Sequence, residues 1–306
     1  MKVQVLGNSS PFTSLRPADT VVIMLTSNGY VLDESETRLA ELEPVPSSER
    51  GDRDALWARL RRDGYLYLKG QLTPERLLDF REFYFASLGE ANVFAPGTDP
   101  RDGIAAEGDV DRAALRRGLF DHIVPGPEYQ ALCTAEGIAD WFAWFLADEV
   151  HLHRRKIIRH TKPGESGIGT ATQAHYDLVY LREGSDRVLS MWIPLGDCPR
   201  ERGGLAYLEG SHHWVMAAER EGTLKMPAAS ITADLPGLAN ERDARWLVTD
   251  YEVGDVVVHS AHIVHAALDN TDRGGAMRLS TDVRYQRLSE AIDWRWQEHW
   301  NYDDGL

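Results

Sequence analysis

The chain has 306 residues, of which 48 are acidic and 33 basic, so its formal net charge is −15 at pH 7. Hydrophobic residues at 43% and charged residues at 26% are typical of a globular protein and exclude a disordered or fibrous one. The acidic excess argues against a nucleic-acid partner, because a protein that binds a duplex needs a basic face.

The sequence shows no targeting signal and no metal-binding pair of cysteines. The apolar stretch at 21–25 is far shorter than the roughly 20 residues that span a bilayer, and no signal peptide follows Met1. Cys133 and Cys198 lie far apart, and we interpret them as two structural thiols rather than as one disulfide. These features predict a cytoplasmic protein without a membrane partner.

The N-terminal half of the chain predicts helices. We interpret residues 1–52 as an extension of uncertain structure that packs on the core, and the firm globular pattern starts at Arg53. Thr73 and Pro74 are typical of a helix start. The predicted elements are helices at 53–64, 73–88, 112–120 and 138–146, a strand at 65–68 and a long loop at 94–112.

The C-terminal half predicts short strands separated by glycine and proline turns. The interval 217–245 is too long for a simple hairpin loop and is typical of a lid. This order predicts an α+β fold with a mainly β core, which is a jelly roll framed by helices. The predicted strands lie at 155–159, 177–181, 188–195, 205–208, 246–248, 256–259 and 277–285.

One histidine stands two residues before an acid, in His175-Tyr176-Asp177. On a strand these two side chains share a face, and with a distant histidine they would form the two-histidine, one-carboxylate triad of non-haem iron oxygenases. By itself the tripeptide is weak evidence, because about two such matches are expected by chance. A surface pair on a strand is the alternative.

Three histidines follow a hydrophobic run, at His259, His262 and His265. On an extended chain the first and last share a face and His262 points away, so the periodicity does not decide which one is a ligand. A zinc cluster on a helix is a second reading, which the β-branched residues before His259 disfavour. Further along, Arg278 could bind a dicarboxylate through paired hydrogen bonds, or it could be a surface arginine on a strand.

These motifs together resemble the phytanoyl-CoA dioxygenase superfamily over about residues 53–300. The ordered set is far more specific than any one of its elements, and it indicates a single domain at 53–306 with a cupin-like double-stranded β-helix. The residues that carry the resemblance are His175-Tyr176-Asp177, Met191-Trp192-Ile193-Pro194-Leu195, Gly203-Gly204-Leu205, Gly210-Ser211-His212, Gly254-Asp255, His265, Asn270, Arg278 and Arg284-Tyr285.

The resemblance implies that His175, Asp177 and His265 bind Fe(II). It also implies that Arg278 binds the distal carboxylate of 2-oxoglutarate, whose other end chelates the metal. Because Asp177 is present, the site differs from that of halogenating relatives, in which a small residue replaces the carboxylate.

Further cosubstrate contacts are implied for Ser190 and Trp192, for which a plain core role is the alternative. The family often has a hydroxyl residue two positions after the distal histidine, where this chain has Ala267. Ser280 is a candidate replacement for that hydroxyl. His259 and His262 are interpreted as structural or supporting residues.

The implied reaction is the oxidation of a C–H bond of a small organic molecule by O2, with release of succinate and CO2. Hydroxylation is the leading expectation, and cyclisation, epimerisation or desaturation would use the same site. A hydrolase or isomerase that uses another metal, and a non-catalytic binding protein, are the other classes. Arginine outnumbers lysine strongly, which is typical of a high-GC bacterium and suggests natural-product (antibiotic) biosynthesis.

The sequence says less about the substrate and the assembly. The segments 94–112 and 217–245 are the candidate lids. Arg155 and Arg159 could meet an anionic substrate or could be ordinary strand charges. The three tryptophans between 294 and 300 are typical of terminal packing or of a dimer contact, so a homodimer is a possible assembly.

Overall fold

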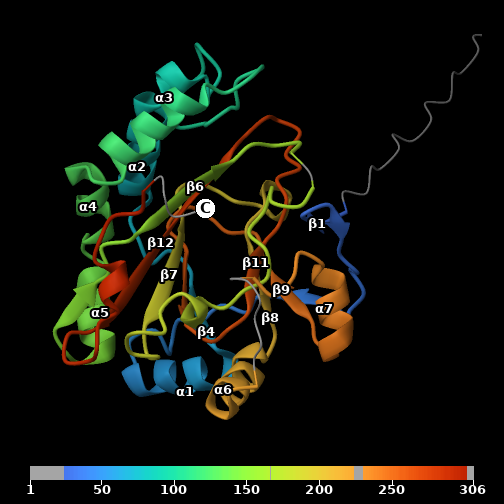
Figure 1. Ribbon diagram of the computed structural model, residues 1–306, viewed down its shortest axis with the longest axis vertical. Helices are drawn as coiled ribbons and strands as arrows, with labels where there is room; N and C mark the ends of the chain where they lie inside the picture. Colours follow the sequence, from blue (N-terminus) through green and yellow to red (C-terminus); the bar gives the residue numbers. More distant parts are fainter. Residues whose placement is uncertain (1–23, 166, 224–229, 302–306) are drawn as a thin grey trace, which may run out of the picture.

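The computed structural model describes residues 24–165, 167–223 and 230–301. Two β-sheets face each other and form the jelly roll that the sequence predicted, with helices outside them (Figure 1). The large sheet has the order β4-β10-β7-β12-β5, with β6 also paired to β12, and the smaller sheet has the order β11-β8-β9-β3. The strands are β3 Leu39–Glu41, β4 Tyr65–Leu68, β5 Val150–Leu152, β6 Ile157–Thr161, β7 Leu189–Pro194, β8 Leu205–Leu208, β9 Trp246–Val248, β10 Val256–Ser260, β11 His265–Ala267 and β12 Arg278–Arg287.

The helices lie mainly around the large sheet. In Figure 1, α2, α4 and α5 run along one side of this sheet, whereas α7 lies beside the smaller one. No helix of the described residues is long and apolar enough to cross a membrane. The α-helices are α1 Arg53–Asp63, α2 Pro74–Ser87, α3 Arg112–Arg116, α4 Pro127–Cys133, α5 Ala139–Leu146, α6 Ser211–Glu221 and α7 Leu235–Arg242, and a π-helix spans Arg117–Ile123.

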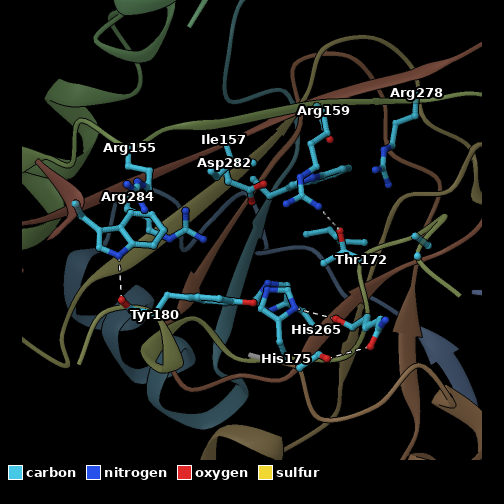
Figure 2. A pocket seen from close by; sticks show the side chains of 18 residues that line it. Arg155, Ile157, Arg159, Thr172, His175, Tyr180, His265, Arg278, Asp282 and Arg284 are labelled. Atoms are coloured by element: carbon cyan, nitrogen blue, oxygen red, sulfur yellow. Dashed lines mark hydrogen bonds between the residues drawn. The ribbon is translucent and has the colours of Figure 1, made fainter. Parts of the chain in front are cut away.

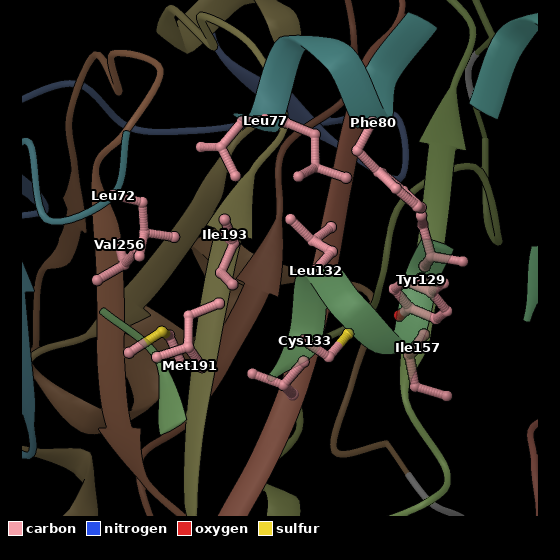
Figure 3. Packing of buried hydrophobic residues seen from close by; sticks show 14 of the residues in the cluster. Leu72, Leu77, Phe80, Tyr129, Leu132, Cys133, Ile157, Met191, Ile193 and Val256 are labelled. Atoms are coloured by element: carbon pink, nitrogen blue, oxygen red, sulfur yellow. The ribbon is translucent and has the colours of Figure 1, made fainter. Parts of the chain in front are cut away.

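The two faces of the large sheet have opposite chemistry. Along β12 the alternate residues Arg278, Ser280, Asp282 and Arg284 face inward and line a cavity (Figure 2). The residues between them face the helices, and the same alternation on β7 turns Met191 and Ile193 outward against α2 and α4 (Figure 3). Because neighbouring residues on a strand point to opposite faces, one strand serves both the core and the cavity.

Most predicted elements are present, and two expectations are wrong. Residues 177–181 are not a strand, because Asp177–Val179 forms a 3-10 helix and Leu178 and Leu181 are buried three positions apart. The interval 217–245 is not irregular throughout, since residues 217–221 belong to α6 and Leu235–Arg242 form α7, and its role as a lid stays a prediction. Apolar residues at spacing three fit one helical turn as well as they fit a short strand, so the pattern alone did not separate the two.

Residues 24–42 pack mainly on the smaller sheet, whereas Val45 and Glu49 contact β4 and α1. β3 pairs in parallel with β9, and two shorter strands, β1 Thr26–Ser27 and β2 Tyr30–Val31, form a ribbon beside it. The Ser27 hydroxyl donates a hydrogen bond to the Ala267 carbonyl oxygen at 2.7 Å. Residues 1–23, with most of the apolar stretch at 21–25, lie outside the described residues. Both cysteines are buried free thiols.

Arg81 on α2 ties the predicted loop at 94–112 to the sheet. Its buried guanidinium donates to the carbonyl oxygens of Arg101 at 2.5 Å, Asp102 at 2.9 Å and Met277 at 3.0 Å. Hydrogen bonds to a charged group contribute about 1.5–3 kcal/mol each, so we expect Arg81→Met to lower the free energy of unfolding by about 3 kcal/mol in urea denaturation. The exposed Arg76 of the same helix supplies the control. If Arg76→Met cost as much as Arg81→Met, the anchoring role would be wrong.

Candidate active site

Three potential metal ligands come together at one end of the jelly roll. The backbones of His175 and His265 form a bridge, in which the N–H of His175 donates to the carbonyl of His265 at 3.0 Å and the reverse bond measures 2.9 Å. The 3-10 turn then brings Asp177 back toward both rings. One ligand atom from each of the three residues lies within 4.8 Å of the others, and all three residues are buried.

The two imidazoles are oriented by their own backbone. The Nδ1 atom of His175 lies 2.8 Å from the carbonyl of Gln173, and that of His265 lies 3.1 Å from the carbonyl of Ile263. With a proton on each Nδ1, both Nε2 atoms are left as acceptors, and they lie 3.8 and 4.0 Å from Oδ1 of Asp177. Burial also lowers the pKa of both rings, which keeps them neutral.

Asp177 is held in its charged form by its neighbours. Burial alone would raise the pKa of its carboxyl, but Arg284, His259 and His265 hold that pKa well below its usual value. Arg284 Nη2 donates to Oδ1 at 2.9 Å, and the Ser190 hydroxyl donates to Oδ2. A set of two neutral imidazoles and one carboxylate on one side of a space fits Fe(II), as in facial-triad sites.

A cavity of 520 Å³ opens from the histidines and reaches Arg278. Arg278 is 4% exposed, its guanidinium donates to the carbonyl oxygen of Gly203, and its Nε has no hydrogen-bond partner among the described residues. Trp192 and Ser280 line the same cavity. Ser190 lies behind Asp177 and is not among the lining residues, so the structure separates it from the other three predicted cosubstrate contacts.

The cavity also contains residues that the sequence did not single out. Asp282 and Tyr180 line it, and Arg284, seen in the sequence only as part of a motif, lies with its guanidinium 4.7 Å from the Trp296 ring centre (Figure 2). The alternation along β12 was the available signal, because Arg278 is a predicted site residue and every second residue after it faces the same way.

The other two histidines of the cluster at 259–265 have different positions. His259 lies inside the jelly roll, with Nε2 3.5 Å from Oδ2 of Asp177 and Nδ1 3.2 Å from the Tyr207 hydroxyl oxygen. His262 lines a separate groove of 410 Å³ beside α1 and α6. The predicted lid segments differ as well, since Ser230 lines the cavity and no residue of 94–112 does.

Ser190→Ala tests whether the hydroxyl holds the Asp177 carboxylate. Removing partners of metal ligands commonly costs 10–100-fold in metal affinity. We therefore expect the dissociation constant for Fe(II), measured anaerobically by titration, to rise about 10-fold or more. Ser185→Ala is a control at a loop position outside the cavity. Unchanged iron affinity in Ser190→Ala would exclude the positioning role.

Comparison with known proteins places this geometry in a family. The family model of phytanoyl-CoA dioxygenase matches residues 60–278. The 1-deoxypentalenic acid 11-beta-hydroxylase of Streptomyces arenae is 28% identical over 246 residues, which cover 78% of this chain and 82% of the hydroxylase. The ectoine dioxygenase of Sphingopyxis alaskensis is 23% identical, and the match covers 75% of this chain and 76% of the dioxygenase.

Solved structures show the same fold. A crystal structure of the epimerase SnoN in complex with Fe3+, alpha ketoglutarate and nogalamycin RO matches with a TM-score of 0.54 at 21% identity, covering 78% of this chain and 85% of the other. The family match extends over most of the chain and includes the whole stretch between the candidate ligands. This chain belongs to the phytanoyl-CoA dioxygenase family and is a non-haem iron, 2-oxoglutarate-dependent oxygenase.

Proposed function

We propose that His175, Asp177 and His265 bind Fe(II) and that the enzyme hydroxylates a small organic molecule of natural-product biosynthesis. The observation that carries the proposal is the buried cluster of these three residues at the cavity that contains Arg278. The bound iron would supply the site at which 2-oxoglutarate and O2 react. The protein supplies oriented donors, a cavity and charged groups for binding.

Arg278 is the residue proposed to bind the distal carboxylate of 2-oxoglutarate. It is a buried cation on the cavity wall, and its unpartnered Nε leaves a donor available. Ser280 lies two residues along the same face and is proposed to add a hydroxyl to that site, while Trp192 forms its apolar side. Ser190 is proposed to orient Asp177 instead of the cosubstrate.

Hydroxylation is favoured over the other outcomes by the curated relatives. The Streptomyces arenae relative is named for an 11-beta-hydroxylation of 1-deoxypentalenic acid, and the chain covers 82% of it. We therefore propose a hydroxylated product, with O2 as the second cosubstrate. The extension at 1–52, the single domain at 53–306, the homodimer and the cytoplasmic location stay predictions from the sequence.

The test is turnover of 2-oxoglutarate by the purified enzyme. We expect succinate release to require both Fe(II) and O2 and to stop in His175→Ala, and mass spectrometry to find a substrate product heavier by one oxygen atom. A product of unchanged mass would indicate epimerisation, and one lighter by two hydrogens would indicate cyclisation or desaturation. Full activity without O2 and 2-oxoglutarate would overturn the proposal in favour of a non-redox metal enzyme.

A further inference from the structure

Arg159 lines the cavity but has no role in the proposed metal and cosubstrate sites. Arg159 lies on β6, where its register partner on β12 is Ser280. Its side chain lines the cavity, and Figure 2 shows it reaching toward Thr172. Thr172 Oγ1 accepts a hydrogen bond from Arg159 Nη1 at 3.3 Å, so this partner is a neutral one.

Arg159 lacks an anionic partner within the part of the chain that the structure describes. No carboxylate oxygen there lies within the 4.0 Å of an ion pair, in contrast to Arg284, which reaches Asp177 at 2.9 Å. Asp282 attracts the Arg159 charge from a greater distance, and burial lowers the pKa of the guanidinium. Arg159 is only partly exposed, and a cation largely withdrawn from water without a counter-ion is costly, so an incoming anion would be stabilised there.

With Fe(II) and 2-oxoglutarate bound, the positive charges of the site would exceed the negative ones, and the charge of Arg159 is the one left without a counter-charge. Fe(II) and Arg278 together would carry one charge more than the dianion 2-oxoglutarate, and Asp282 can offset at most that one charge, because burial raises the pKa of its carboxyl. Arg284 balances Asp177. The charge of Arg159 then remains.

We infer that Arg159 binds a carboxylate of the organic substrate, so that the enzyme acts on small organic acids. The inference rests on the proposed function, because it assigns Arg278 and the metal to 2-oxoglutarate. The 520 Å³ cavity has the size of sites that bury drug-sized ligands. Ile157, Trp192 and Leu205 line it and offer apolar surface to the hydrocarbon part of such an acid.

The test uses the anaerobic enzyme loaded with Fe(II) and 2-oxoglutarate. The probes are decanoate, cyclohexanecarboxylate, adamantane-1-carboxylate and 3-phenylpropanoate, each compared with its methyl ester. Entry of a ligand beside the metal shifts the weak visible absorption band of the iron and keto-acid complex. We expect at least one acid to shift the band saturably, and its ester to bind at least about 10-fold more weakly.

Two variants then assign the effect to the guanidinium. Arg159→Gln should weaken binding of the responsive acid at least about 10-fold and leave its ester unaffected, whereas Arg159→Lys, which keeps the charge, should restore part of the affinity. Both should bind 2-oxoglutarate as the wild type does, judged from the intensity of the same band. The exposed Arg154, five positions earlier, supplies the control Arg154→Gln.

The outcomes show whether Arg159 binds a carboxylate of the substrate or one of 2-oxoglutarate. Weaker 2-oxoglutarate binding in Arg159→Gln would overturn the inference, because Arg159 would then belong to the cosubstrate site. Equal responses to acids and esters, or no response to any acid while the wild-type band is intact, would overturn it as well. Failure of the wild-type enzyme to form the band at all would instead contradict the proposed function.

Discussion

Replacing His265 by alanine should abolish iron binding and, with it, the turnover of 2-oxoglutarate. Its Nε2 is one of three ligand atoms in the cluster, and the bond from Nδ1 to the Ile263 carbonyl holds the ring in place. Loss of groups that only support metal ligands already costs 10–100-fold in affinity, so the loss of a ligand should exceed about 100-fold. Anaerobic Fe(II) titration and succinate release measure the two effects.

The control for His265→Ala is another histidine of the same chain. His213 is exposed on α6, and His213→Ala should bind iron and turn over 2-oxoglutarate as the wild type does. Thermal unfolding of both variants without metal separates loss of the ligand from loss of the fold. If the folded His265→Ala protein retained wild-type iron affinity, His259, which lies next to Asp177, would become the candidate third ligand.

Arg278→Ala should raise the KM for 2-oxoglutarate by about 100-fold. Truncating one member of a buried charge pair costs about 2–5 kcal/mol, because the other charge is left without a partner. Fe(II) affinity in the absence of 2-oxoglutarate should change little, since Arg278 is not part of the ligand cluster. Steady-state succinate release at varied 2-oxoglutarate, together with anaerobic iron titration, checks both expectations.

Two further variants sharpen the test of Arg278. Arg278→Lys keeps the charge but loses the paired hydrogen bonds of the guanidinium, so its KM should lie between those of the wild type and the alanine variant. Arg273→Ala removes an exposed arginine from the loop before β12 and should leave the KM unchanged. An unchanged KM in Arg278→Ala would move the cosubstrate carboxylate to another cation of the cavity.

The helices and strands predicted from local sequence patterns agree best with the structure where the sequence has a clear start and end signal. Strand 65–68, strand 205–208 and strand 246–248 agree with β4, β8 and β9 residue for residue. The turn at Asp177 was missed because its apolar spacing fits a helical turn and a short strand alike, and the groups that hold its carboxylate, Arg284 and Ser190, lie elsewhere in the sequence. A local window contains neither of them.

In the candidate site, too, some residues were predictable from the sequence and others were not. His175, Asp177, His265 and Arg278 were chosen in the sequence by motif. The structure brings the first three together, and the two histidines line one cavity with Arg278. Of the three histidines in the cluster, periodicity left His259 and His265 equivalent. The positions of the ligand atoms distinguish them, because His265 and not His259 forms a group with His175 and Asp177 among the described residues.

By itself, the sequence determined the class of chemistry, because that class depends on which donor types are present and in what order along the chain. It also determined the mainly β core, since alternation along each strand is a local property. The tertiary structure decided which side chains share a space: it placed Ser190 behind Asp177, and it placed Arg159 on the cavity wall without a carboxylate partner among the described residues. The position of Arg159 depends on the pairing of β6 with β12, two segments more than 100 residues apart, and no local pattern contains that pairing.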